Sequence, residues 1–317
     1  MSRKSNDQGR AFEFITLNTL AEEIGNLRPV VVRKNSSLVA TKRSWDNIEV
    51  DLQSDLKKAA KSAVETIFDL EPMILEDGND KLELFIQKDS EGKEGDVRDI
   101  LIVRRNVQWE IGLSLKHNHF AVKHARLSKT RDFGKIWFDM PCSEQYWAEV
   151  NPLFKYLNDE RKKGILWENL PNKEDDVYVP LLNAFKDEVE RSTNLNPEVP
   201  RRMVEYLLGQ YDFYKVVSLD RKKLTQIFTF NLRGTLNQAS KNAEPNTKIP
   251  VVNLPTRIIA IDFKPESKTT VELFMDEGWQ FSFRIHNASS KVEPSLKFDI
   301  QIVGMPTTII TINCMWK

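Results

Sequence analysis

Hydrophobic residues recur at helical spacing near the N-terminus of the chain. In residues 10–28, Leu17, Leu20 and Ile24 are three and four positions apart, and Phe14 and Ala21 widen the apolar stripe. Residues 46–70 repeat this pattern and predict a second helix, whereas residues 81–87 (KLELFIQ) predict a short strand. The pattern therefore predicts two helices followed by a strand.

Glu13 heads the apolar stripe of the first predicted helix, because it stands four residues before Leu17. A carboxylate directed at a core is unfavourable unless it is paired or binds a metal ion. A glutamate in the first turn, which favours the helix N-terminus, explains the position as well. Periodicity alone leaves both interpretations open.

Residues 95–119 (GDVRDILIVRRNVQWEIGLSLKHNH) predict two strands, 100–103 and 109–116, joined by a polar turn. Side chains alternate between the two faces of a strand. Trp109, Ile111, Leu113 and Leu115 therefore share one face of the second strand. Its other face is composed of Glu110, Gly112, Ser114 and Lys116.

Asp99 directly precedes the first of these strands. A four-residue turn over 105–108 places Asp99 opposite Ser114, and a two-residue turn places it opposite Gly112. In both registers Asp99 shares a face with Glu110 and Lys116. Carboxylates that hold a divalent metal ion, next to a lysine that handles a proton, are the usual apparatus for hydrolysing a phosphodiester. The hairpin is therefore a candidate nuclease site.

The rest of the chain alternates in character. Residues 119–127 predict a helix that carries Lys123 and Arg126, and residues 142–230 predict several amphipathic helices. Residues 234–250 are polar and rich in turn formers, and five segments between 256 and 316 alternate as strands do. We therefore expect a mixed α/β fold with three regions, 1–140, 141–245 and 246–317.

Composition places the chain only broadly. It has 317 residues, of which 40% are hydrophobic and 29% charged, as in an ordinary globular protein. No apolar run reaches 18 residues, the N-terminus lacks the apolar stretch of a signal peptide, and the two cysteines, Cys142 and Cys314, indicate neither a disulfide framework nor a zinc site. We expect an intracellular, cytoplasmic protein.

Positive charge is concentrated between residues 104 and 135, although the formal net charge of the chain is zero. Only Glu110 and Asp132 oppose the basic residues there. A basic cluster that overlaps a candidate metal site suits a polyanionic substrate. The basic residues of this segment are Arg104, Arg105, Lys116, Lys123, Arg126, Lys129, Arg131 and Lys135, with His117, His119 and His124.

Two groups of polar residues are candidates for contact with DNA. The consecutive His117, Asn118 and His119 spell HNH, but nucleases of that name spread these residues over a ββα unit. The tripeptide is therefore not an HNH motif. We expect the first group to contact DNA next to the cut. We expect the second group, at the end of a predicted strand, to position phosphates or read guanines. The first group is Ser114, His117, Asn118, His119, Lys123, His124, Arg126 and Ser128, and the second is Arg284, His286, Asn287, Ser289, Ser290 and Lys291.

The hairpin resembles the core of the PD-(D/E)xK nuclease superfamily, which has a helical glutamate, a strand aspartate and an acid-x-lysine motif. Glu13, Asp99 and Ser114-x-Lys116 occupy these positions. Ser114 departs from the motif, which puts the second metal ligand in doubt. Glu110, on the same face, is the expected substitute, and Asp96 is a rival for Asp99.

Longer strings are more specific, and GDVRDILI, WEIGLSLKHNHFAVKHARLS and WQFSFRIHNASSKVEPSLKFDIQIVG resemble the HaeIII type II restriction endonucleases. The resemblance covers essentially the whole chain. It implies a restriction-endonuclease-like core in 1–140, a helical region in 141–245 and a β-rich DNA-recognition region in 246–317. It further implies Mg²⁺-dependent cleavage of double-stranded DNA at GGCC, between the central G and C, with blunt ends.

The resemblance also implies roles for the site residues. Asp99, with Glu110 or a backbone carbonyl, would hold Mg²⁺, Glu13 would add an outer ligand, and Lys116 would orient or deprotonate the nucleophile or stabilise charge on phosphate. A palindromic target suggests a homodimer, although a monomer that cuts each strand in turn is also possible. A methyltransferase of the same specificity is an expected partner that need not touch this chain.

Two alternatives remain open from the sequence. One is a repair or junction-resolving nuclease of the same superfamily. The other is a non-catalytic DNA-binding protein with a degenerate nuclease core, which Ser114 leaves possible.

Overall fold

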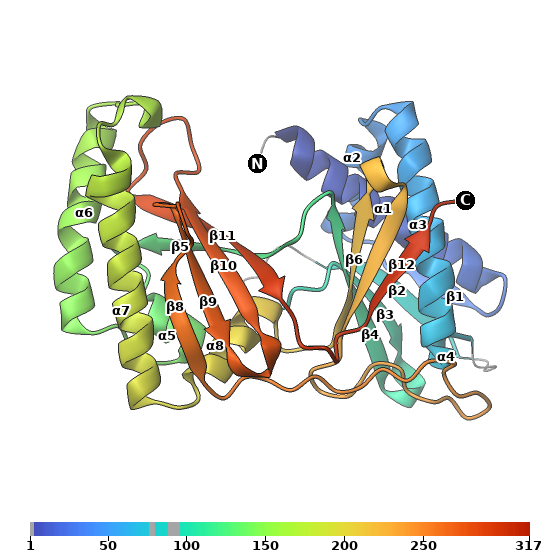
Figure 1. Ribbon diagram of the computed structural model, residues 1–317. Helices are drawn as coiled ribbons and strands as arrows, with labels where there is room; N and C mark the ends of the chain where they lie inside the picture. The colour runs from blue at the N-terminus through green and yellow to red at the C-terminus, as the bar shows by residue number, and fades with distance from the viewer. Residues whose placement is uncertain (1–2, 76–79, 88–95) are drawn as a thin grey trace. The chain divides into compact units, whose positions relative to one another are not determined.

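The computed structural model describes residues 3–75, 80–87 and 96–317. This part of the chain contains eight α-helices and two sheets, of seven and five strands, so the mixed α/β class is confirmed (Figure 1). No helix within these ranges is long and apolar enough to span a membrane. The chain forms two compact units. The first unit is Met1–Phe120, Gln210–Val252 and Thr307–Lys317, and the second unit is Ala121–Gly209 and Asn253–Pro306.

This division is not sequential, unlike the three predicted regions. The chain leaves the first unit after Phe120, returns at Gln210, leaves again after Val252 and returns at Thr307. Strand pairing is the physical reason, because segments distant in sequence complete each sheet through backbone hydrogen bonds.

The first unit is built on the seven-stranded sheet, in the order β1-β2-β3-β4-β6-β7-β12. Strands β4 and β6 are parallel, and β3 pairs with β4 as an antiparallel hairpin. The elements are α1 (Arg3–Gly25), β1 (Val30–Val32), α2 (Ser36–Asp46), α3 (Val50–Leu70), α4 (Pro72–Leu75), β2 (Leu82–Ile86), β3 (Ile100–Arg104), β4 (Trp109–His117), β6 (Phe213–Leu219), β7 (Leu224–Phe230) and β12 (Thr311–Met315).

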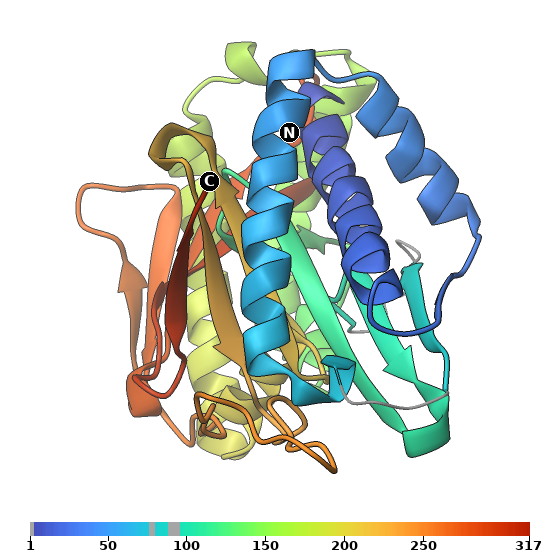
Figure 2. The ribbon, with the colours of Figure 1, turned by 90° about the vertical axis from the view of Figure 1, so that its right-hand side faces the viewer.

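Helices α1 and α3 cover one face of this sheet (Figure 2). The buried core joins residues of both helices to Trp109, Ile111, Leu113 and Leu115 of β4, which is the apolar face predicted from the alternation. The polar face of β4 is therefore turned away from these helices.

The second unit is built on the five-stranded sheet, in the order β5-β11-β10-β9-β8. Its core is aromatic: Phe185 of α7 lies 5.1 Å from Phe298 and 5.5 Å from Phe283, measured between ring centroids. The elements are β5 (Ala121–Ser128), α5 (Phe133–Phe138), α6 (Glu144–Lys162), α7 (Val179–Leu195), α8 (Val199–Leu208), β8 (Ile258–Phe263), β9 (Thr270–Met275), β10 (Gln280–His286) and β11 (Ser295–Gly304).

Two predicted helical segments are wrong. Residues 119–127 form most of β5, which pairs with β11 and buries Ala121, Ala125 and Leu127 at two- and four-residue spacing. The predicted helical stretch ends at Leu208 rather than 230, because β6 and β7 follow. Every residue of β6 is buried, so the strand has no polar side to reveal period two.

The other predicted elements agree better with the structure. The strand at 81–87 and the hairpin are confirmed as β2, β3 and β4, and the five C-terminal strands are confirmed as β8 to β12. The helix predicted over 46–70 begins later, at Val50, and a separate helix, α2, ends at Asp46.

Candidate active site

The hairpin of β3 and β4 has the register expected for a four-residue turn. Ile100 lies opposite Leu113, and the Asp99 amide donates to the Leu113 carbonyl at 2.7 Å. Residues 105–107 form a 3₁₀ turn, and Gln108 closes it in the left-handed region with φ 53°. Asp99 is thereby placed beside Ser114 on the polar face of β4.

An ion pair occupies the end of this face. Lys116 Nζ lies 3.1 Å from Asp99 Oδ2, which also accepts from the Leu115 amide at 2.6 Å and from Ser114 Oγ at 3.4 Å. The side chains of Asp99 and Lys116 are 25% and 29% exposed, so both are partly accessible to solvent. Asp99, Ser114 and Lys116 are therefore in contact, whereas the predicted convergence also included Glu110.

Glu13 belongs to the same electrostatic environment. Burial lowers the pKa of Lys116, but the charges of Asp99 and Glu13 outweigh it and hold that pKa above its ordinary value. Glu13 is the eleventh residue of α1, so the first-turn explanation does not apply. It borders a cavity of about 320 Å³ that Arg10, Ser36 and Ile86 also line.

Glu110 lies on the same face but has a different partner. Arg98 Nη1 donates to Glu110 Oε1 at 2.9 Å, and the buried Arg98 side chain crosses the face directly over Gly112. A Cβ on Gly112 would lie only 2.0 Å from Arg98 Cδ. Because Gly112 has no side chain, Arg98 has room to cross the strand and bind Glu110.

Asp96 is also held by Arg98. Its carboxylate accepts from Arg98 Nη2 at 2.7 Å and from Gln87 Nε2 at 2.7 Å. Burial raises the pKa of Asp96, but the hydrogen bonds from Arg98 and Gln87 hold it below its ordinary value. Asp99 therefore contacts Lys116, whereas Asp96 and Glu110 contact Arg98.

Lys215 is a site neighbour that the sequence did not single out. It lies opposite Ser114 in the parallel pairing of β4 and β6, and its Nζ donates to the Phe120 carbonyl at 2.6 Å. Burial and the charge of Lys116 lower the pKa of Lys215 to about 7. The helix predicted over this segment concealed it, since only strand pairing places it beside Ser114.

Comparison with known proteins identifies the family of this chain. The family model described as HaeIII restriction endonuclease matches residues 9–306. The chain belongs to the HaeIII restriction endonuclease family. The type II restriction enzyme HaeIII of Haemophilus aegyptius is 54% identical over 319 residues, covering 100% of both chains. No solved structure gives a significant match. As a member of the HaeIII family, the chain is a site-specific deoxyribonuclease that acts on double-stranded DNA.

In this HaeIII-family chain, His117 at the end of β4 and Asn118 directly after it contact the turn between β6 and β7. His117 Nε2 lies 2.7 Å from Asp220 Oδ2, and Asn118 Nδ2 donates to the same oxygen at 2.8 Å. Burial raises the pKa of Asp220, but these two neighbours hold it below its ordinary value. His119 follows, half-buried.

The predicted DNA-contacting residues of β5 lie in the second unit. Lys123 Nζ donates to the Tyr206 carbonyl at 2.7 Å, and burial lowers its pKa to about 8. His124 Nδ1 lies 2.7 Å from Asp299 Oδ1, and Arg126 Nη1 lies 3.0 Å from Glu293 Oε2. Lys123, His124 and Arg126 therefore each have a partner within the second unit, on α8, on β11 and in the segment before β11 respectively.

The loop after β10 divides into structural and exposed residues. Asn287 Nδ2 donates to the carbonyls of Ser289 and Lys291, and its Oδ1 accepts from the Glu293 amide at 3.1 Å. Ser289 Oγ accepts from the Lys291 amide at 3.2 Å. These bonds fix the loop, while the Lys291 side chain is exposed.

Arg284 and His286 of β10 lie beside Asp299 of β11. Arg284 is exposed and pairs with Asp299 across the strands, and His286 Nδ1 is 3.6 Å from Asp299 Oδ2. Burial lowers the pKa of His286, so its neutral form is favoured. Of the second predicted group, Arg284 and Lys291 are the cations that face solvent.

Proposed function

We propose that this HaeIII-family enzyme uses Mg²⁺ to cut both strands of double-stranded DNA at GGCC, between the central G and C, leaving blunt ends. The Asp99–Lys116 pair is the observation that carries the proposal. It joins a solvent-accessible carboxylate to a lysine at the end of one strand face, an arrangement that suits metal-assisted hydrolysis of a phosphodiester.

The residues around Asp99 suit Mg²⁺. Among the described residues, no group of three or more His, Cys, Asp or Glu side chains is arranged as a metal site. Mg²⁺ needs less than such a cage, because it commonly retains several waters and takes one or two carboxylates together with substrate phosphates. Asp99 would supply the principal ligand and Glu13 an outer one. Glu110 would reach the ion only by leaving Arg98.

Mg²⁺, when bound, would polarise the scissile phosphate and lower the pKa of a coordinated water. Lys116 has the charge and exposure to act beside it. Paired with Asp99 and near Glu13, its amine is held as an ammonium group, which donates hydrogen bonds. We assign Lys116 to orienting the attacking water and stabilising negative charge on the phosphate. Ser114 Oγ supports the Asp99 carboxylate.

We assign recognition of the DNA sequence to the second unit. Arg284 and Lys291 would reach guanine O6 and N7 in the major groove, where arginine and lysine make the commonest specific contacts. A two-fold homodimer would match the palindromic target with one active site for each strand. A methyltransferase of the same specificity would protect the host DNA without contacting this chain.

Digestion of plasmid DNA tests the proposal. The purified chain is incubated with plasmid in Mg²⁺ or in EDTA, and the fragment ends are sequenced. Discrete fragments that end in blunt GG/CC halves, formed only with Mg²⁺, are expected. Cleavage that follows DNA junctions or damage would favour a repair nuclease, and DNA that is bound but never nicked would favour a non-catalytic protein.

A further inference from the structure

The second unit contains a large groove outside the candidate active site, and two of its lining residues, Arg126 and Ser128, belong to the first group of predicted DNA contacts. Its volume is about 980 Å³, and it lies between the end of β5, the turn that follows, and helix α6. We call it the β5–α6 groove. Its lining residues are Arg126, Ser128, Lys129, Thr130, Arg131, Ala148, Asn151, Pro152, Phe154, Lys155, Asn158, Pro294 and Ser295.

The charge of the β5–α6 groove is one-sided, since no aspartate or glutamate is among these lining residues. Arg126 is neutralised by Glu293 at 3.0 Å. Lys129, Arg131 and Lys155 are exposed, and none of them forms an ion pair with another residue in the described ranges. Several other exposed lysines of the unit, such as Lys268 with Asp175, are paired, although Lys291 is not paired with any described residue. The groove therefore concentrates three uncompensated cations.

Helix α6 adds neutral donors to the same wall. Asn151, Lys155 and Asn158 are four and three residues apart, so they project from one side of the helix. Neither asparagine side chain hydrogen-bonds to another described residue. Ser128 and Thr130 supply hydroxyls from the opposite wall. Such a set of donors suits the oxygens of a phosphate chain.

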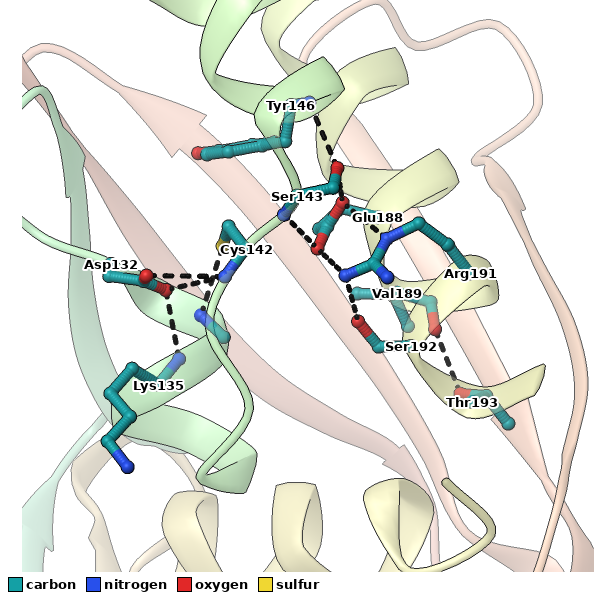
Figure 3. Close-up of polar contacts among 11 residues, drawn as sticks. Asp132, Lys135, Cys142, Ser143, Tyr146, Glu188, Val189, Arg191, Ser192 and Thr193 are labelled. Atoms are coloured by element: carbon teal, nitrogen blue, oxygen red, sulfur yellow. Dashed lines mark hydrogen bonds and ion pairs between the residues drawn. The ribbon is translucent and has the colours of Figure 1, made fainter. Parts of the chain in front are cut away.

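The two walls are held in place by a polar network (Figure 3). Asp132, next to Arg131, accepts from the amides of Lys135 at 2.9 Å and of Cys142 at 3.1 Å. Ser143, which caps the N-terminus of α6, donates to Glu188 of α7 through its amide and its hydroxyl. The turn and the helix are thus fixed before any ligand binds, which reduces the entropy lost on binding.

We propose that the β5–α6 groove binds the sugar–phosphate backbone of the DNA substrate. The inference rests on the proposed function, because it names a second contact for the same substrate. Phosphate contacts hold a duplex in register without reading its sequence. The donors of the groove are cations, amides and hydroxyls, and its one aromatic lining residue, Phe154, is buried and offers no surface for stacking bases.

The test measures binding of a fluorescent 30-base-pair duplex containing one GGCC site, in EDTA so that no cleavage occurs. The variant Lys129→Gln/Arg131→Gln/Lys155→Gln is compared with wild type and with Arg161→Gln/Lys162→Gln/Lys268→Gln. The control removes the same charge from exposed positions of the same unit outside the groove. Dissociation constants are measured from low to high salt.

The groove variant is expected to bind roughly 10- to 100-fold more weakly, and the slope of log K against log salt is expected to fall by about 2–3. The control should stay close to wild type in binding and in cleavage. Unchanged binding by the groove variant would overturn the proposal. An equal loss in both variants would also overturn it, because general charge would then explain the effect.

Two further measurements keep the result decisive. If the triple variant unfolds, Lys155→Glu on the exposed side of α6 replaces it, and wild-type affinity in that variant would overturn the proposal. Wild-type digestion with Mg²⁺ runs in parallel. A wild type that binds DNA but does not cut it would refute the proposed function. The comparison of binding between the groove variant and the control would still test whether the β5–α6 groove binds DNA.

Discussion

Gly112→Ala should damage the site by displacing Arg98. Gly112 does not have a positive φ, so an alanine there meets no backbone strain and the effect is purely one of space. Its added Cβ would lie 2.0 Å from Arg98 Cδ, 2.5 Å from Cγ and 2.8 Å from Cβ. Rotation of the side chain cannot relieve the contact with Arg98 Cβ, so the backbone must move, either in β4 or in the segment that leads into Asp99.

The expected magnitude follows from these contacts. Overpacking of a buried position costs about 1–3 kcal/mol. The loss approaches about 3–5 kcal/mol if Arg98 separates from both Asp96 and Glu110, because its guanidinium is buried. Cleavage should suffer too, since a displacement of about 1 Å in a catalytic group can lower the rate by about 100-fold.

Thermal unfolding and cleavage kinetics measure the two effects. Gly112→Ala is expected to lower the thermal midpoint by roughly 2–10 °C. Gly9→Ala is the matched control, because its Cβ meets nothing within 4 Å and alanine stabilises a helix by about 0.5–1 kcal/mol relative to glycine. Wild-type stability and cleavage in Gly112→Ala would refute the packing of Arg98 over Gly112.

Three further predictions concern other residues. Burial raises the pKa of Glu71 from 4.5 to about 7, so the folded chain keeps a proton that the unfolded chain has lost, and stability falls as the pH rises between these values. Glu71→Gln keeps the oxygen that accepts from Tyr214. At pH 8 this variant should therefore be more stable than wild type by up to about 3 kcal/mol, measured in denaturant titrations. Stability curves of variant and wild type that run parallel across this pH range would contradict the prediction. Asn287→Ala should lower the free energy of unfolding by about 1–3 kcal/mol through its three lost hydrogen bonds, and an unchanged denaturation midpoint would contradict that structural role. Glu110→Gln should cut DNA at a rate close to wild type in a plasmid assay, because Arg98 holds Glu110, whereas loss of cleavage would assign Glu110 to the metal ion.

Local patterns were sufficient to predict the hairpin. The alternation from Trp109 to Lys116 gives one apolar and one polar face, and with a turn of two or four residues this periodicity places Asp99 and Lys116 on the same face of the hairpin. The C-terminal strands alternate in the same way. Strand β6 does not, because it is buried on both sides, and Lys215 could therefore not be placed beside Ser114.

Contacts between side chains or strands on different segments of the chain could not be predicted. Glu110 had the right spacing for a metal ligand, but its position depends on Arg98, which no periodicity links to it. One signal was present: a glycine inside a strand often marks the close approach of another group, and Gly112 does so for Arg98. The assignment of residues 121–140 to the second unit likewise depends on the pairing of β5 with β11.

Single-turnover cleavage by Lys116→Ala tests the central claim, that the Asp99–Lys116 pair is the catalytic site. The assay follows a labelled GGCC duplex with excess enzyme and Mg²⁺, and binding is measured in EDTA alongside. Cleavage is expected to fall by at least about 10²–10³-fold, because a preorganised positive charge is lost from the site. DNA binding and the thermal midpoint should remain close to wild type. Cleavage by Lys116→Ala at near wild-type rates would contradict the account.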